Sequence, residues 1–258
     1  MKLYCKYIKI HFKSAMQYKL SFIMAFTSQI LVLFSYYFTI LCLFDKFSNV
    51  KGFTLYEVLF SYGIIQFGTA TCESFFRGID HFDRYILEGT FDRLLLRPRN
   101  TLLQVFCEDI DFIKFSKLLQ GIIIIIIALL KLDIEWNIYR VITFICMLIS
   151  SVVIFLGLFI LAASYCFVTV KGLEVRNIFT DGFKHIAQYP IGIFKKGFVL
   201  FLTYVIPFGF VNYYPLLYFL GRTDNKLLSI SPLITIVYLI PIIMIFNRGV
   251  RKYTSVGS

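Results

Sequence analysis

Long apolar blocks alternate with charged segments along this chain of 258 residues. A helix needs about 20 predominantly apolar residues, within a range of about 17–25, to cross the hydrocarbon layer of a bilayer. Six blocks meet this requirement, at Leu20–Phe44, Val58–Phe76, Phe112–Leu130, Val141–Val170, Phe198 to about Leu220, and Ile230–Phe246. The pattern therefore predicts an all-α, polytopic membrane protein with six transmembrane helices.

Composition supports the membrane assignment. Apolar residues make up 59% of the chain and aromatic residues 19%, and the mean hydropathy is +0.78. These values lie outside the range of soluble globular domains. The first block has about 25 residues, whereas the apolar core of a cleaved signal peptide has about 7–15, so we expect the first block to be a retained span.

The Lys and Arg residues predict the orientation. Of the 26 basic residues, six fall on one side of the predicted membrane, at Lys46, Lys51, Lys131, Arg140, Arg222 and Lys226. The remaining 20 fall on the other side, before residue 20 and within Arg77–Lys117, Lys171–Lys196 and Arg248–Lys252. Because basic loops stay in the cytoplasm, both termini are predicted to be cytoplasmic, in a bacterial plasma (inner) membrane. Topology and anionic lipid explain the net charge of +11, so no nucleic-acid partner is expected.

The segment before the first span has two faces. Its lysines recur every three or four residues, at Lys2, Lys6, Lys9 and Lys13. A second face carries Tyr4, Ile8, Phe12 and Ala15. This spacing predicts an amphipathic helix over residues 1–19 that lies in the cytoplasmic interface and contacts lipid. The alternative is an unstructured basic leader that only enforces topology.

The cytoplasmic loop 77–111 is long and mixes both charge signs. Gly89 can end one short helix, Thr90 can cap a second one, and Pro98 can stop the second after the leucine ridge 94–96. Connectors in helical bundles usually have about 2–8 residues, and a leucine ridge needs a surface to bury against. The loop is therefore predicted to dock a protein. A solvated connector is the alternative.

Polar residues mark the second block, at Gly63, Gln66, Gly68, Thr69, Thr71, Glu73 and Ser74. Exposure of these groups to lipid on all sides would be costly, so this helix must face protein or a polar pathway. Glu73 could contact a transported substrate. Pairing of its carboxylate with the nearby Arg77 is the favoured reading.

Two prolines interrupt the fifth block. Pro207 and Pro215 flank Asn212, and proline removes a backbone donor and clashes with the preceding helical turn. Broken backbone at membrane depth persists only when it is buried in protein or lines a cavity. We expect a re-entrant or lid-like piece on the outer side, and a simple kink in one long helix is the alternative.

Catalytic motifs are missing from the sequence. No phosphate-binding glycine loop occurs, and the three histidines and six cysteines show no ligand spacing. We therefore expect no catalytic residue, metal site or cofactor in this chain.

A motif in the long cytoplasmic loop resembles a known family. The run Glu88-Gly89-Thr90-Phe91-Asp92-Arg93-Leu94-Leu95-Leu96-Arg97-Pro98 is similar to the signature of a subfamily of ABC-2 type permeases. Tyr189-Pro190, Pro207, Pro215 and Leu220-Gly221-Arg222 look like later landmarks of this subfamily. The resemblance implies an export permease of six helices over residues 20–258, with a cytoplasmic coupling helix in loop 77–111.

The same resemblance implies partners. Two copies of a separate ATPase would bind ATP and Mg²⁺, and a second permease, identical or unlike, would complete a dimer. The implied ATPase-coupling residues are Asp83, Arg84, Glu88, Gly89, Phe91, Asp92, Arg93, Leu94, Leu95 and Arg97. The substrate is not implied.

Two other classes of function remain open. An intramembrane lipid-modifying enzyme would bring polar residues of several spans to one reaction centre. A secondary transporter would show internal repeats and paired charges at mid-membrane depth. The sequence shows neither His or Asp clusters in the spans nor such repeats.

Overall fold

The structure is a computed structural model that describes residues 2–46, 49–50, 52–169, 177–187, 189 and 191–255. Helices dominate the described residues, which contain no β-strand beyond an isolated bridge between Val50 and Phe53. The first half contains α1 (Lys2–Ala15), η1 (Met16–Tyr18), α2 (Lys19–Lys46), α3 (Leu55–Phe75), α4 (Arg77–Asp80), α5 (Phe82–Leu87), α6 (Phe91–Leu95), α7 (Thr101–Glu108), η2 (Phe112–Lys114) and α8 (Phe115–Lys131). The second half contains α9 (Ile138–Tyr165), η3 (Ile178–Gly182), α11 (Phe183–Ala187), η4 (Ile191–Ile193), α12 (Lys196–Tyr204), η5 (Gly209–Tyr213), α13 (Tyr214–Phe219), α14 (Leu227–Ile230), η6 (Ser231–Leu233) and α15 (Ile234–Lys252).

Four helical stretches are long and apolar enough to cross a membrane. They are Lys6–Lys46, Phe112–Lys131, Ile138–Tyr165 and Leu227–Lys252. A fifth is added if Lys196–Tyr204 and Gly209–Phe219, which meet at 95°, form one broken span. The helix of the second predicted block, α3, has 21 residues but is less apolar than these four. The all-helical fold is thus confirmed, with four to five candidate spans among the described residues where six were predicted.

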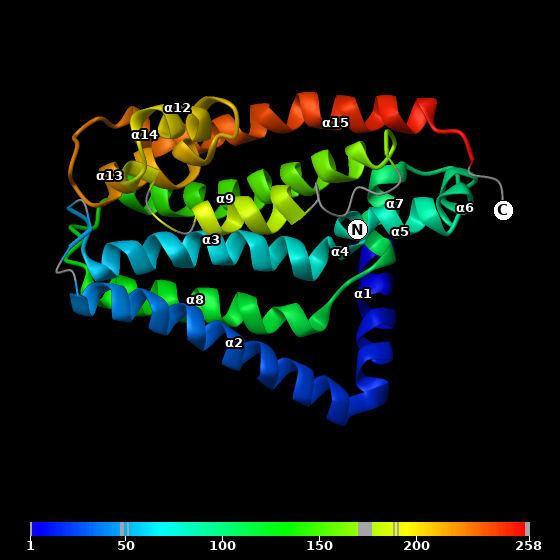
Figure 1. Cartoon of the computed structure of the whole chain (residues 1–258), viewed down its shortest axis with the longest axis horizontal. Helices are drawn as coiled ribbons and strands as arrows, with labels where there is room; N and C mark the ends of the chain where they lie inside the picture. The colour runs from blue at the N-terminus through cyan, green and yellow to red at the C-terminus, as the bar shows by residue number, and fades with distance from the viewer. Residues whose placement is uncertain are drawn as a thin grey trace.

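The long helices run side by side along the long axis of the molecule (Figure 1). The central one is α3, which packs against α8 and α9, while α15 packs against α9. The close approach of α3 and α9 depends on small residues, since a Cβ at Gly68 of α3 would lie 2.6 Å from the backbone of Ser151 of α9. Most of α3 is buried, including Gln66 and Thr69, which confirms that this block faces protein.

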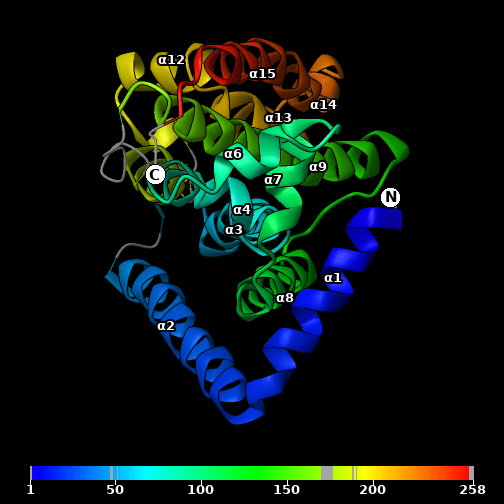
Figure 2. The ribbon, with the colours of Figure 1, turned by 90° about the vertical axis from the view of Figure 1, so that its right-hand side faces the viewer.

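The first two helices form a V whose arms enclose α8 (Figure 2). The Tyr4 hydroxyl, near the start of α1, donates a hydrogen bond to the Phe75 carbonyl at 2.5 Å. The ring of Phe12 packs edge-on against Phe112 at 5.3 Å between centroids. The exposed lysines of α1 are Lys6, Lys9 and Lys13, while the side chain of Lys2 lies outside the described residues.

Both termini lie in the same half of the molecule as α4 to α7 (Figure 1). The opposite half holds α12, α13 and α14. Because α9 ends near the first group and α14 and α15 begin in the second, the chain between α9 and α14 passes from one half of the molecule to the other (Figure 1). The charge pattern assigned Lys196 to a cytoplasmic loop, but the position of α12, which begins at Lys196, speaks against that assignment.

The predicted break in the fifth block is present. Pro207 is buried between α12 and η5, where the chain turns by 95°, so one straight helix is excluded. Pro215 is buried in the first turn of α13. The Asn212 side-chain amide donates to Ser61 Oγ at 2.5 Å, which ties the broken segment to α3. Pro190, a residue of the family resemblance, lies outside the described residues.

Candidate functional site

The predicted docking segment forms two short helices, α5 and α6. Gly89 has a φ of +64°, a left-handed conformation that glycine adopts without strain, and it separates the two helices as predicted. Helix α6 ends at Leu95, three residues before Pro98. Thr90 precedes α6, but its hydroxyl donates to the Tyr85 carbonyl at 3.5 Å and makes no capping bond.

Part of the predicted docking set belongs to the core. The Phe91 side chain has no exposed area, and its ring packs against Phe82 at 5.0 Å and Tyr253 at 5.1 Å. Leu94 and Asp83 are also buried. Direct contact of these three side chains with a partner is therefore not possible in this conformation. The leucine ridge is reduced to Leu95 and Leu96, of which Leu96 is 85% exposed.

The charged residues of this segment face outward. Arg84, Glu88, Arg93 and Arg97 are exposed. Arg97 forms an ion pair with Glu108 of α7 at 3.1 Å. Asp92 accepts a hydrogen bond from Ser255 Oγ at 2.5 Å, so the C-terminal tail contacts the segment. A hollow of about 330 Å³ opens beside these groups, lined by Tyr85, Glu88, Thr90, Arg93, Leu94, Arg97 and Glu108.

Helices α4 and α7, which adjoin the docking segment, are tightly packed against each other. A Cβ at Gly78 of α4 would lie 2.0 Å from the Val105 carbonyl oxygen of α7, so the two helices meet backbone to backbone. His81 Nδ1 lies 3.1 Å from Asp109 Oδ2. Burial alone would raise the pKa of Asp109, but the hydrogen bond and charge of His81, with Arg77 nearby, lower it below its usual value. Burial also raises the pKa of Tyr85, which keeps its hydroxyl protonated.

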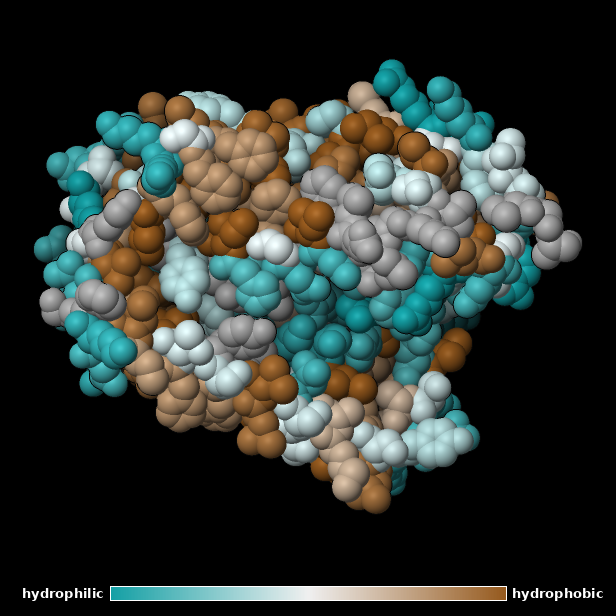
Figure 3. All heavy atoms as spheres, viewed as in Figure 1, coloured by the Kyte–Doolittle hydropathy of each residue, from teal (hydrophilic) through white to brown (hydrophobic). Residues whose placement is uncertain are grey.

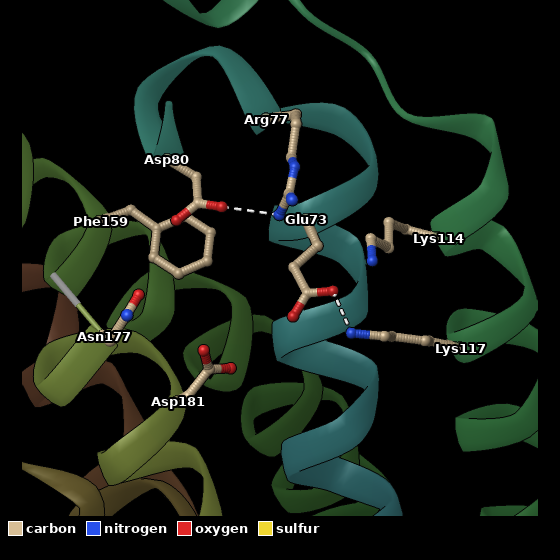
Figure 4. A pocket seen from close by; sticks show the side chains of 8 residues that line it. All are labelled: Glu73, Arg77, Asp80, Lys114, Lys117, Phe159, Asn177 and Asp181. Atoms are coloured by element: carbon tan, nitrogen blue, oxygen red, sulfur yellow. Dashed lines mark hydrogen bonds and ion pairs between the residues drawn. The ribbon is translucent and has the colours of Figure 1, made fainter. Parts of the chain in front are cut away.

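A charged pocket of about 260 Å³ lies beside the same end of α3 (Figure 4). Its lining consists of Glu73, Arg77, Asp80, Lys114, Lys117, Phe159, Asn177 and Asp181. The Glu73 carboxylate pairs with Lys117 Nζ at 2.6 Å, and Arg77 pairs with Asp80 at 2.6 Å. The favoured partner of Glu73, Arg77, was therefore wrong: the ion pair links α3 to α8 across 44 residues of sequence.

The predicted pathway residues do not form one site. Glu73 lies in the charged pocket, whereas Asn212 binds Ser61, which is twelve residues earlier on α3, or about 18 Å along the helix. Pro207 lines a separate, mostly apolar pocket of about 350 Å³ next to α15. Sequence reasoning missed Asn177 and Asp181, because no local pattern connects them to α3.

The described residues contain no group of three or more His, Cys, Asp or Glu side chains placed to hold a metal ion. Two arrangements combine charged side chains with a cavity, namely the docking segment and the charged pocket. Both lie in the half of the molecule that holds the termini (Figure 1).

Comparison with known proteins identifies a family. The family model described as ABC-2 family transporter protein matches residues 30–257, which is almost the whole chain. No curated protein and no solved structure matches the chain.

Proposed function

The chain belongs to the ABC-2 family of transporter proteins, and from this premise we propose that it is the permease subunit of an ATP-binding-cassette exporter, coupled to a separate ATPase. Members of this family are components of transporters, and not enzymes themselves. The observation that carries the coupling proposal is the docking segment, residues 83–97. It presents exposed charges, three exposed leucines (Leu87, Leu95 and Leu96) and a hollow at one end of the helix bundle.

The exposed groups of this segment suit a protein partner. Leu95 and Leu96 offer apolar surface that water does not favour. Arg93 and Arg97 lie at the hollow and can pair with acidic side chains, which sets the register of a docked partner. The buried side chains of Phe91 and Leu94 would not contact the partner, and they would instead anchor α6 to the membrane-spanning helices. The end that carries this segment is proposed to be cytoplasmic, in agreement with the charge pattern.

We also propose six crossings. Helix α3 is the second: its 21 residues span about 31 Å, and surrounding helices shield its polar groups from lipid. The segment η3–α11 belongs to the fifth, because the chain must cross the bundle once between α9 and α15. The α12–η5–α13 segment is then re-entrant from the outer side, as its place beside α14 supports (Figure 1).

The remaining parts of the proposal concern the interface and the partners. Helix α1 would lie in the cytoplasmic interface, with its exposed lysines near anionic lipid. Burial raises the pKa of Tyr4 to about 12, so its hydroxyl stays protonated and keeps its bond to the Phe75 carbonyl. A second permease would complete the pathway in the bacterial plasma membrane, and two ATPase copies would supply ATP and Mg²⁺ binding.

Charge reversal of the docking segment tests the coupling. In a variant with Arg93→Glu and Arg97→Glu, the two side chains remain outside the membrane, and the lost Arg97–Glu108 ion pair is partly exposed and contributes little to stability, so the permease should still fold and insert. The new carboxylates would face an acidic partner surface, and we expect about tenfold or greater loss of ATPase affinity. The measurement is co-purification of the ATPase with tagged permease, together with ATP hydrolysis coupled to transport in vesicles.

A variant with Arg248→Glu and Arg251→Glu is the matched control. It makes the same charge change on exposed residues near the C-terminal end of α15, outside the docking segment. Co-purification should stay within about twofold of wild type in this control. If the Arg93/Arg97 variant also retained full co-purification and full coupled hydrolysis, residues 83–97 would have no part in coupling.

A further inference from the structure

The charged pocket is polarised across its width (Figure 4). Lys114 of η2 and Lys117 of α8 line one side. The opposite side carries the side chains of Phe159, Asp80, Asn177 and Asp181. A ligand that spans this pocket would therefore meet cations at one end and oxygen acceptors with an aromatic ring at the other.

Two of the pocket's charges are available to such a ligand. Glu73 and Lys117 neutralise one another, as do Arg77 and Asp80. Among the described residues, neither Lys114 nor Asp181 takes part in an ion pair or side-chain hydrogen bond. Charges at the edge of a membrane-spanning bundle are costly when unpaired and commonly mark substrate pathways.

We propose that this pocket binds a zwitterionic head group that carries a phosphate and an amine. The phosphate lies on Lys114, next to the ammonium of Lys117, because lysine binds phosphate as a point charge. The amine lies between the Asp181 carboxylate and the ring of Phe159, which offers a cation–π contact. The inference rests on the proposed export function and names the class of cargo.

Size and surroundings favour a head group over a whole molecule. Pockets for drug-sized ligands have about 300–1,000 Å³, and this one has about 260 Å³. An attached apolar chain would have to lie outside it. In the space-filling view, hydrophilic and hydrophobic areas of the molecular surface adjoin one another (Figure 3). A molecule with a polar head group and an apolar chain can therefore meet a matching surface with each part.

Binding to the permease alone tests the proposal. The purified chain in a non-ionic detergent is titrated calorimetrically with dihexanoylphosphatidylethanolamine, dihexanoylphosphatidylglycerol and free O-phosphoethanolamine. The wild type should bind the amine lipid about tenfold more tightly than the glycerol lipid. Lys114→Gln should weaken both lipids about fivefold or more, whereas Asp181→Asn should weaken only the amine lipid and abolish the preference.

Matched controls lie at the other end of α8. Lys131→Gln and Asp133→Asn remove the same charges from exposed residues outside the pocket and should leave all affinities unchanged. Unfolding midpoints should match the wild type in all four variants, since none of them removes an ion pair of the described residues.

The outcomes separate cleanly. Equal affinity for the two lipids, or wild-type affinities in both pocket variants, would overturn the proposal. If free O-phosphoethanolamine binds as tightly as the amine lipid, the head-group chemistry is supported and the natural ligand is a soluble molecule. If it binds much more weakly, the head group belongs to a lipid. The titration contains no ATPase, so a failure to bind the lipid would not contradict the proposed coupling through residues 83–97. In the same way, a failure of the co-purification experiment would not contradict lipid binding in the pocket.

Discussion

Arg222 holds together the loops at the end of the bundle away from the termini. Its Nη2 donates to both carboxylate oxygens of Glu57, at 2.7 and 2.6 Å, and to the Gly52 carbonyl at 2.7 Å. The guanidinium also stacks over the ring of Phe53 at 4.5 Å. Glu57 is 8% exposed, and it accepts a hydrogen bond from the Thr54 backbone as part of the cap of α3.

Arg222→Ala should destabilise the protein. Removing one partner of a mostly buried pair leaves a carboxylate without its counter-charge, and the partial exposure of Arg222 limits the cost to about 1–3 kcal/mol. Arg222→Lys should cost less, because one ammonium can keep an ion pair but not the stacking. The measurement is the thermal unfolding midpoint in detergent. The control is Lys226→Ala, which removes an exposed cation over Tyr139. Equal unfolding midpoints for Arg222→Ala and Lys226→Ala would contradict the stabilising role of Arg222.

The ion pairs also show what sequence can reveal about single residues. Arg77 stands four positions after Glu73, so local helical spacing suggested that they pair. The structure instead pairs Glu73 with Lys117 of α8, because α3 and α8 pack along their lengths. Spacing rules find partners within one helix. They cannot find a partner that the tertiary fold supplies from 44 residues away.

At the scale of elements, an aromatic cluster joins the docking helices to the spans. Phe82 of α5 packs against Phe91 of α6, Phe246 of α15 and Phe167 after α9, at centroid distances of 5.0, 5.6 and 5.2 Å. Tyr253 of the C-terminal tail completes the cluster against Phe91. A movement of α6 would therefore displace α9 and α15, since close-packed cores transmit strain.

Tyr253→Ala should loosen this connection. The variant removes a ring from one side of Phe91, so α6 loses part of its anchor while its exposed charges remain. We expect ATPase co-purification within about twofold of wild type and a loss of about fivefold or more in transport per ATP hydrolysed. Tyr253→Phe keeps the ring and should behave as wild type. Full coupling in the alanine variant would show that the tail has no role in transmission.

The helices themselves were largely predictable. Apolar length located the four long stretches, the residues around Gly89 and Pro98 located the short helices, and Pro207 located the break. These features are local: each follows from hydropathy or from the backbone limits of one residue. The burial of Phe91, the contact of the tail with Asp92 and the pocket that joins α3 to η3 depend on packing between distant segments, which a single sequence does not encode as a pattern.

At the scale of the whole molecule, the fold and the charge pattern agree on a polarity for the termini and loop 77–111, whereas Lys196, which begins α12, lies in the other half. The termini and the docking segment lie in one half of the bundle, and the loop that holds Arg222 lies in the other (Figure 1). Six crossings are consistent with this arrangement, because an even number returns the chain to the side on which it began. The biased distribution of Lys and Arg predicts that the half with the termini is cytoplasmic.

Labelling of single cysteines in intact cells tests that polarity. In a variant with all six native cysteines replaced, a new cysteine is placed either at the exposed Arg93 or at the exposed Asp224. If the docking segment faces the cytoplasm as proposed, a maleimide that cannot cross the membrane should label Asp224→Cys from outside and leave Arg93→Cys unlabelled. Both positions should react after the cells are permeabilised, which controls for accessibility in the folded protein. Labelling of Arg93→Cys from outside would invert the topology, and with it the docking segment could not reach a cytoplasmic ATPase.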